Sequence, residues 1–386
     1  MSENRAPPIR ALLVDPSLFT APYDAALTEG LVAAGVEPTW ATRPTRAGDR
    51  QEIASEYVDD FFYRRVDGMT FLPGPLRALA KGVAHALGLA QLVMRVVAER
   101  PDVVHFQWLV VPPLDALAIR IIASRCPVVF TVHDTVPFNG DHLTMLQKLV
   151  LDLPIRLSDR VIVHTEAGRA RLRARGVPNE KLAVIPHGPL RLHLPPSPPA
   201  RAPKPAGGLL TFVAFGEIKR YKGPDVLIEA VARLSPSLRP RARFIIAGRP
   251  RMDLAPLLAR VAELGLQDCV EIWPRRLTEV EMAALFEQTD CFVFPYRQID
   301  ASGVYFLTKS FGKWIIASRV GVFAEDVNEG VQGQLVAPED PQALAAAIAA
   351  TIRDRPVPRP SSPASAWLEI GHATREVYAQ ARPRAA

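Results

Sequence analysis

Residues 210–234 read LTFVAFGEIKRYKGPDVLIEAVARL, and this stretch decides the fold class. Leu210–Phe215 is a short apolar run rich in residues that favour strands, which is typical of a strand buried on both faces. Gly216 follows directly, and after a cationic loop the segment Gly223–Leu234 has the apolar spacing of a helix. A buried strand, a glycine turn and a helix in this order form the repeating unit of a parallel sheet covered by helices, so the stretch predicts an α/β fold.

The same unit recurs on both sides of this stretch. Before it, the expected strands are Ile9–Val14, Val103–Phe106, Val128–Val132, Arg160–Val163 and Leu182–Ile185, with an expected helix at Tyr23–Ala34. After it, the expected strands are Arg243–Ala247, Cys269–Ile272, Cys291–Phe294 and Trp314–Ala317, with an expected helix at Leu254–Leu264. Helix-length segments lie beside these strands, as right-handed crossover connections require.

Two domains are expected, because 386 residues exceed the usual size of one domain and a proline-dense segment interrupts the pattern. Residues 193–206 favour neither a helix nor a central strand, so we expect them to be a stiff linker. The first α/β domain then covers residues 1–192 and the second covers 207–360. A closing helix at 364–380 follows a further proline-rich stretch and is expected to pack back on the first domain.

The composition fits a folded protein with sizeable cores, because 48% of the residues are apolar. The net charge is +6, but 40 acidic residues accompany 46 basic ones, and no basic stripe with interleaved aromatic residues is found. This pattern argues against nucleic acid as a partner and favours an anionic group such as a phosphorylated substrate or a lipid headgroup. The three cysteines lie far apart, without a CxxC pair or a histidine at ligand spacing, so neither a disulfide framework nor a metal site is expected.

The chain is expected to be cytoplasmic, because a polar N-terminal tail runs straight into the first strand without the apolar core of a signal peptide. No segment is expected to reach the about 18 apolar residues of a spanning helix. Leu76–Val97 is apolar with interspersed basic residues, which is typical of a helix lying on anionic lipid and more often of a core-facing helix. Peripheral membrane contact therefore stays one of two interpretations of this segment.

The loop after Phe215 carries the strongest chemical signal. Glycine at Gly216 allows a ligand to approach the backbone closely, and Lys219, Arg220 and Lys222 place cations beside it. The helix that starts near Gly223 adds the positive end of its dipole, so the loop suits a diphosphate. The alternative is a tight turn with solvated charges.

A second glycine-containing loop, Asp300–Val304, follows the expected strand Cys291–Phe294. The backbone at Ser302 and Gly303 opens a helical stretch and is placed to donate N–H groups to a phosphate. Such turns are common, so the loop is informative mainly because it accompanies the first one.

Histidines mark the strand ends of the first half. His133 lies just past the carboxyl end of a strand, at the edge where open α/β sheets bind ligands, and is a candidate donor to a substrate hydroxyl. The alternative is a histidine that satisfies loop backbone. For His187 a turn-shaping role is favoured, and for His105 and His164 a structural one.

Taken together, the motifs resemble glycosyltransferase family 4, the retaining GT-B group, and in particular a subgroup common in bacterial polysaccharide assembly. The segments that carry this resemblance are Thr131–Pro137, Ser158–Thr165, Val184–Gly188, Phe215–Gly223, Phe294–Tyr296 and Ser302–Val304. They run in the family's order from about residue 103 to the terminal helix, and the ordered set is more specific than any one motif.

The resemblance implies two Rossmann-like domains that face a central cleft, with a nucleotide sugar bound there as the donor substrate. Lys219 and Lys222 would neutralise the donor diphosphate, and His133 would face the donor sugar; these three form the implied catalytic set. The implied donor-binding set is Gly216, Arg220, Gly223, Tyr296, Asp300, Ser302, Gly303, Val304 and Glu325. The resemblance implies neither a metal nor a cofactor.

Three departures from the family pattern stand in the sequence. Many members carry two glutamates with seven residues between them, but either alignment leaves the second position with Thr308 or Leu307. Glu217 replaces an arginine that many relatives carry after the loop glycine, and Asp134 replaces an asparagine. An acid beside a phosphate site is unfavourable unless it turns away or pairs with a lysine.

The resemblance therefore implies transfer of a sugar from a nucleoside diphosphate to an acceptor hydroxyl with retention of configuration. The expected acceptor is a saccharide, in particular a lipid-linked one at the inner face of the plasma membrane. The runner-up enzyme is a sugar-nucleotide epimerase, which needs no acceptor. A catalytically silent GT-B subunit that scaffolds a polysaccharide complex and a nucleic-acid-binding module are the non-enzymatic alternatives.

Overall fold

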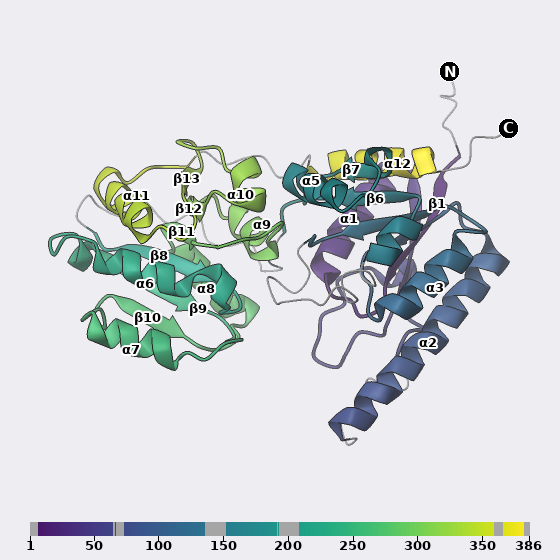
Figure 1. Cartoon of the computed structure of the whole chain (residues 1–386), viewed down its shortest axis with the longest axis horizontal. Coiled ribbons are helices and arrows are strands. Elements are labelled where there is room, and N and C mark those ends of the chain that lie inside the picture. Colours follow the sequence, from purple (N-terminus) through teal and green to yellow (C-terminus); the bar gives the residue numbers. More distant parts are fainter. Residues whose placement is uncertain are drawn as a thin grey trace. The chain divides into compact units, whose positions relative to one another are not determined.

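The computed structural model of this chain describes residues 7–64, 66, 73–135, 152–190, 192, 208–358 and 366–381. Within them the chain forms two compact units (Figure 1). Unit 1 contains residues up to 135, residues 152–188 and the C-terminal helix, and unit 2 contains residues 189–358. The linker expected at 193–206 lies outside the described residues.

Unit 1 is built on a parallel sheet, which in the described residues has seven strands in the order β3-β2-β1-β4-β5-β6-β7. The strands are β1 Ile9–Asp15, β2 Val36–Thr42, β3 Val58–Asp59, β4 Val103–Phe106, β5 Val128–Val132, β6 Arg160–Val163 and β7 Leu182–Val184. The helices are α1 Ala21–Ala33, α2 Gly74–Glu99, α3 Pro112–Ile122, α5 Glu166–Ala174 and α12 Ala366–Ala381. The strand order reverses between β1 and β4, and open sheets bind ligands beside such a reversal.

The sequence pattern missed β2, because Glu37 and Pro38 interrupt its apolar run. A proline is tolerated there because β3 pairs with β2 only at Trp40 and Ala41. At Pro38 the strand therefore has a ladder partner on one side alone, which is the position where the missing N–H costs least. Val58–Asp59 is too short to give an alternating pattern, and β3 was missed as well.

The C-terminal helix α12 packs against α1, the first helix of the chain (Figure 1). Two glycines bring the helices together, since a Cβ at Gly371 would lie 2.0 Å from the carbonyl oxygen of Gly30. Trp367 of α12 also lies against Gly188, where a Cβ would meet its ring at 2.4 Å. Glycine at these positions is therefore a packing requirement.

Unit 2 repeats the architecture, and its described residues form six parallel strands in the order β10-β9-β8-β11-β12-β13. The strands are β8 Leu210–Phe215, β9 Ala242–Ala247, β10 Val270–Trp273, β11 Cys291–Phe294, β12 Trp314–Ser318 and β13 Gly333–Val336. The helices are α6 Pro224–Ala232, α7 Ala255–Glu263, α8 Glu279–Gln288, α9 Gly303–Lys309, α10 Gly321–Asp326 and α11 Pro341–Asp354. The predicted α/β class is confirmed, and β13 is the strand of this unit that the pattern did not predict.

Candidate functional site

The loop after β8 is shaped around Gly216. This residue has φ +111°, and a Cβ there would lie 2.7 Å from Nζ of Lys222 and 2.8 Å from Cγ2 of Val304. The absence of a side chain therefore lets the lysine of one loop and the valine of α9 approach the same stretch of backbone. Three residues predicted for the site are brought together in this way.

Lys222 lies at the end of the short helical turn Arg220–Lys222 and is half-buried. Burial lowers the pKa of Lys222 to about 8, and the nearby charge of Lys219 contributes to this decrease. Its Nζ also lies 5.5 Å from the centre of the Tyr296 ring. A cation held in surroundings that disfavour its charge gains most from an incoming anion, which fits a phosphate-binding role.

Gly223 ends this turn and starts α6 with φ +66°. A Cβ at Gly223 would lie 2.0 Å from the carbonyl oxygen of Pro295, so the lysine turn packs directly on the chain that follows β11. The tight approach fixes where α6 begins and keeps Lys222 next to Tyr296.

Glu217 is paired on both sides. Its carboxylate lies 2.8 Å from Nζ of Lys219 and 2.8 Å from Nε of Arg251. Partial burial raises the pKa of Glu217, but the hydrogen bonds and charges of Lys219 and Arg251 outweigh that effect and bring it down to about 2. Lys219 is thus engaged with Glu217, whereas Lys222 is the lysine that lies against Gly216.

The second predicted loop meets the first at the N-terminus of α9. Ser302 is buried and caps this helix, its hydroxyl accepting a hydrogen bond from the N–H of Tyr305 at 3.4 Å. Gly303 is exposed, and Val304 packs on Gly216. The glycine loops of β8 and of α9 therefore form one continuous surface in unit 2.

The remaining predicted donor-site residues lie around this surface in different settings. Asp300 is 3% exposed, and its carbonyl oxygen accepts a hydrogen bond from Val322 at the start of α10. Glu325 lies on α10 and is exposed. The Arg220 side chain is exposed as well, while its carbonyl oxygen accepts a hydrogen bond of 2.6 Å from Arg297.

Sequence reasoning missed Arg297, which also pairs with Asp225 at 2.7 Å and with Glu339 at 2.8 Å. These bonds tie the chain after β11 to the first turn of α6. Arg297, Asp225 and Glu339 lie far apart in the sequence, so no local motif predicts that they form ion pairs.

Unit 1 holds a buried chain of histidines at the carboxyl ends of β5, β6 and β7. His133 Nδ1 lies 3.0 Å from Nε2 of His164, and His164 Nδ1 lies 3.0 Å from the carbonyl oxygen of Ile185. On its other side His133 Nε2 lies 3.1 Å from Oε1 of Gln107. The ring of Trp108 stacks on His133 with centroids 4.9 Å apart.

The Ile185 carbonyl oxygen determines which ring nitrogens of His164 and His133 carry a proton. Burial lowers the pKa of His164 to about 4 and that of His133 well below its usual value, so both rings are neutral at pH 7. The Ile185 carbonyl only accepts, so His164 donates from Nδ1 and accepts at Nε2. His133 then donates from Nδ1 and its Nε2 is left as an acceptor. This assignment requires the Gln107 amide to be turned, so that its N–H and not its Oε1 faces His133.

The other two histidines complete the setting. His105 is buried and lies within hydrogen-bond distance of Tyr378 and Thr131, at 2.7 Å each. His187 Nδ1 donates to the carbonyl oxygen of Gly188 at 2.7 Å, and its ring packs against Tyr23. His164, expected to be structural, is the direct hydrogen-bonding partner of His133. Among the described residues no group of three or more histidine, cysteine, aspartate or glutamate side chains gathers to hold a metal.

Solved structures identify the class to which this fold belongs. The Anabaena protein HepE, solved in complex with UDP and glucose, matches with a TM-score of 0.63 at 18% identity, covering 97% of this chain and 95% of that chain. The catalytic domain of starch synthase IV from Arabidopsis thaliana, bound to ADP and acarbose, matches with a TM-score of 0.66 at 11% identity, covering 98% and 100%. At these identities the likeness shows the fold, and the chain is a GT-B protein with two Rossmann-like domains.

Family models identify the particular family. The model described as Glycosyltransferase Family 4 matches residues 25–188, and the model described as Glycosyl transferases group 1 matches residues 210–354. The two matches fall on the two units in turn. Together with the fold, they show that the chain is a GT-B glycosyltransferase of the family 4 type.

Curated relatives are named D-inositol 3-phosphate glycosyltransferase. The one from Nocardiopsis dassonvillei is 34% identical over 208 residues, which are 50% of this chain and 48% of the relative. The one from Acidothermus cellulolyticus is 25% identical over 360 residues, which are 84% of this chain and 76% of the relative. The match to the first of these spans about half of that relative's length.

Proposed function

We propose that the chain is a retaining glycosyltransferase that moves a sugar from a nucleoside diphosphate to an acceptor hydroxyl without a metal. The observation that carries the proposal is the setting of Lys222, a half-buried lysine whose ammonium group lies beside Gly216 and the start of α9 and whose pKa is lowered to about 8. Such a group binds the charge that develops on a departing diphosphate more strongly than one in water. The N–H groups at the start of α9 add donors to the same surface.

In the proposed reaction the acceptor oxygen attacks the anomeric carbon on the face from which the diphosphate leaves. The bond between the anomeric carbon and the phosphate oxygen breaks, and that oxygen takes the proton of the acceptor hydroxyl. Lys222 stabilises the negative charge on the leaving group. His133 is held neutral by its burial, and its ring nitrogens are bonded to His164 and Gln107. In the proposed complex its Nε2 exchanges Gln107 for a hydroxyl of the donor sugar.

The first donor to test is a UDP-sugar, because HepE was solved with UDP and glucose. The paired state of Glu217 also supports a donor site, since Lys219 and Arg251 neutralise the one acid beside the loop glycine. The proposed acceptor is a lipid-linked saccharide at the cytoplasmic face of the membrane, in polysaccharide biosynthesis.

The membrane part of the proposal rests on α2. Among the described residues it is the one helix whose length and composition would allow it to cross a bilayer, so the expectation that no segment reaches this threshold is wrong. One face of α2 is buried in unit 1, through residues such as His85, Leu89, Leu92 and Val96. A helix committed to a protein core on one side is better suited to lie on a membrane than to span it.

The opposite face of α2 is apolar and exposed. It carries Leu76, Leu79, Val83, Leu87 and Met94, which are 54% to 67% exposed. Residues 74–98 contain no aspartate or glutamate, and Arg77 adds an exposed positive charge. An apolar stripe in a basic helix suits the surface of an anionic leaflet.

The deciding experiment incubates the purified protein with UDP- and GDP-sugars, with and without membrane lipid extract, and measures the released nucleoside diphosphate. We expect release with one donor, an increase with the extract, and loss in Lys222→Ala. The Arg233→Ala variant, at an exposed residue just after α6, serves as the matched control and keeps the activity. No release, together with no binding of UDP or GDP by calorimetry, would refute the proposal and favour a silent subunit; conversion of the donor without an acceptor would favour an epimerase.

A further inference from the structure

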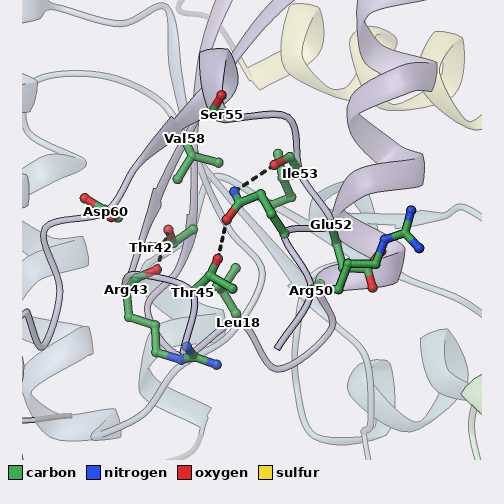
Figure 2. A pocket seen from close by; sticks show the side chains of 12 residues that line it. Leu18, Thr42, Arg43, Thr45, Arg50, Glu52, Ile53, Ser55, Val58 and Asp60 are labelled. Carbon is green, nitrogen blue, oxygen red and sulfur yellow. Dashed lines mark hydrogen bonds between the residues drawn. The ribbon is translucent and has the colours of Figure 1, made fainter. Parts of the chain in front are cut away.

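Unit 1 contains a pocket of about 310 Å³ that none of the family motifs touches (Figure 2). It lies at the carboxyl ends of β2 and β3 and in the loop that joins them, with one wall from the loop between β1 and α1. Its volume is at the lower end of small-molecule sites, which is suitable for a ligand of one ring. The carboxyl edge of a parallel sheet is where α/β domains bind their ligands.

The pocket walls are held in place by Arg43. This residue is 6% exposed and donates from Nε to the carbonyl oxygen of Ser17 at 2.9 Å and from Nη1 to the carbonyl oxygen of Pro44 at 2.7 Å. It thereby clamps the loop after β1 to the loop after β2. Leu18, on the first of these loops, has φ +50°, a conformation that a leucine adopts only where its surroundings impose it.

The lining combines hydrogen-bonding groups with small apolar surfaces. The Gln51 side chain accepts a hydrogen bond from the hydroxyl of Thr45 and donates one to the carbonyl oxygen of Ile53. Ser55 contributes a hydroxyl, and Val58 an apolar patch. Alternating hydroxyl, amide and apolar groups complement the hydroxyls and the C–H faces of a sugar ring.

The charges of the lining argue against a phosphate. Arg43 and Arg50 are balanced by Glu52 and Asp60, which line the same pocket. The guanidinium of Arg43 is moreover engaged with backbone carbonyls and lies 3.7 Å from Asp49. A phosphate site needs an excess of donors and positive charge, so this pocket favours a neutral ligand.

The distance between the pocket and His133 along the sheet indicates which part of a substrate the pocket would bind. His133 follows β5, and the sheet order places β5 three strand steps from β2. Neighbouring strands are about 4.8 Å apart, so the two sites are separated by about 14 Å across the sheet. That distance exceeds one sugar ring, so a ligand in the pocket lies away from the hydroxyl that reacts.

We propose that this pocket binds a neutral sugar residue of the acceptor saccharide, at a distance from the reacting hydroxyl. That the bound sugar belongs to the acceptor rests on the proposed transferase function. That the pocket binds a sugar does not depend on that function. The pocket would then let the enzyme distinguish acceptors by a residue that takes no part in the chemistry.

The test is saturation-transfer NMR with the methyl glycosides of glucose, galactose, mannose and N-acetylglucosamine, and with myo-inositol 1-phosphate as a charged comparison. We expect at least one neutral glycoside to bind the wild-type chain. Gln51→Ala should weaken this binding at least tenfold by removing an amide from the lining, and Ser55→Trp should abolish it by filling the pocket. Ser55 is exposed, so the larger side chain leaves folding intact. Glu56→Gln, exposed on the same loop, is the matched control and should bind as the wild type does.

The pocket proposal is overturned if no neutral glycoside binds, if only the inositol phosphate binds, or if glycoside binding survives both pocket variants. UDP binding, measured by calorimetry on the same samples, reports on unit 2 and should be unchanged in Gln51→Ala and Ser55→Trp. Glycoside binding without any nucleotide binding would leave the pocket standing and refute the transferase. Nucleotide release without glycoside binding would support the transferase and refute the pocket proposal.

Discussion

Lys222 in unit 2 and His133 in unit 1 both have a pKa that burial lowers. Burial shifts the pKa of each toward its neutral form, and neighbouring cationic or titratable groups add to the shift. A lysine shifted in this way is responsive to an anion, whereas a neutral histidine offers a directed hydrogen bond. In the proposed reaction Lys222 therefore supplies charge, and His133 supplies a hydrogen bond once a ligand takes the place of Gln107.

Lys222 predicts a pH dependence of nucleotide binding. Its pKa of about 8 lies below the usual value, so the ammonium group is charged below pH 8 and loses its charge as the pH rises above it. Affinity for UDP should therefore fall above pH 8, by up to about tenfold per pH unit. Calorimetry between pH 7 and 9.5 measures this slope. Lys222→Arg, which stays charged, should flatten it, and an equally steep slope in that variant would contradict the assignment.

Gly216 predicts a steric effect. Gly216→Ala introduces a Cβ 2.7 Å from Nζ of Lys222 at φ +111°. We expect a loss of about 1–3 kcal/mol in the free energy of unfolding and a larger loss of UDP affinity than of stability. Chemical unfolding and calorimetry measure the two quantities. Gly82→Ala in α2, where a Cβ would meet nothing within 4 Å, is the control and should keep both.

At the scale of elements, helices α2 and α12 show how one amphipathic pattern leads to different outcomes. Both have a buried face, but α12 is covered by α1 through the Gly30–Gly371 contact, whereas α2 keeps an apolar face exposed. A stripe of apolar side chains opposite the buried face is not needed for packing, and it marks α2 as an interaction surface.

The exposed face of α2 predicts binding to anionic vesicles. Leu79→Asp and Leu87→Asp place charges at side chains that are 66% and 67% exposed, so folding should be unchanged. We expect at least a tenfold loss of binding to phosphatidylglycerol-containing vesicles in sedimentation assays. Val280→Asp, which is 70% exposed on α8, is the control. The membrane proposal fails if the wild-type chain ignores the vesicles or if both α2 variants bind as well as it does.

The contact between α1 and α12 predicts a stability effect. Gly371→Val would place a side chain 2.0 Å from the carbonyl oxygen of Gly30, and the helices would have to separate. We expect a loss of at least about 2 kcal/mol in the free energy of unfolding and faster proteolytic release of the C-terminal helix. His372→Val, on the exposed face of the same helix, should change neither.

At the scale of the whole molecule, the buried histidines give unit 1 a sensitivity to acid. His164 has a pKa of about 4 in the folded chain, against about 6.5 in the unfolded chain. Between these values the unfolded state binds more protons, so stability is complete above pH 6.5 and decreases as the pH falls toward 4. The decrease is about 1.4 kcal/mol per pH unit for one such histidine.

Thermal unfolding between pH 7.5 and 4.5 tests this. Tryptophan fluorescence follows the process, with Trp40, Trp108 and Trp367 reporting on unit 1. His164→Asn should reduce the pH dependence of the unit 1 transition. His372→Gln, an exposed histidine, should leave it unchanged. A wild-type transition that does not shift with pH would contradict the burial of neutral histidines.

The strands with continuous apolar runs, such as β5 and β11, were predictable because a parallel strand buried on both faces has no other sequence pattern. The loop Gly216–Gly223 was predictable as a ligand-binding loop, because a glycine between a strand and a helix has few structural uses. Strand β2 could not be predicted from the sequence, because its apolar run breaks at Glu37 and Pro38. Its proline is accommodated by the position of β3, which is a tertiary fact.

The sequence by itself determined the α/β class, the order of the motifs and the glycine loops, because these depend on local spacing along the chain. Only the tertiary structure decided that Lys222 and Val304 meet at Gly216, that Lys219 pairs with Glu217, and that His164 orients His133. It also decided which face of α2 is covered and where the pocket beside Gln51 opens. Hydrogen bonds and burial join residues that are distant in the chain, and their strength depends on surroundings that no local pattern contains.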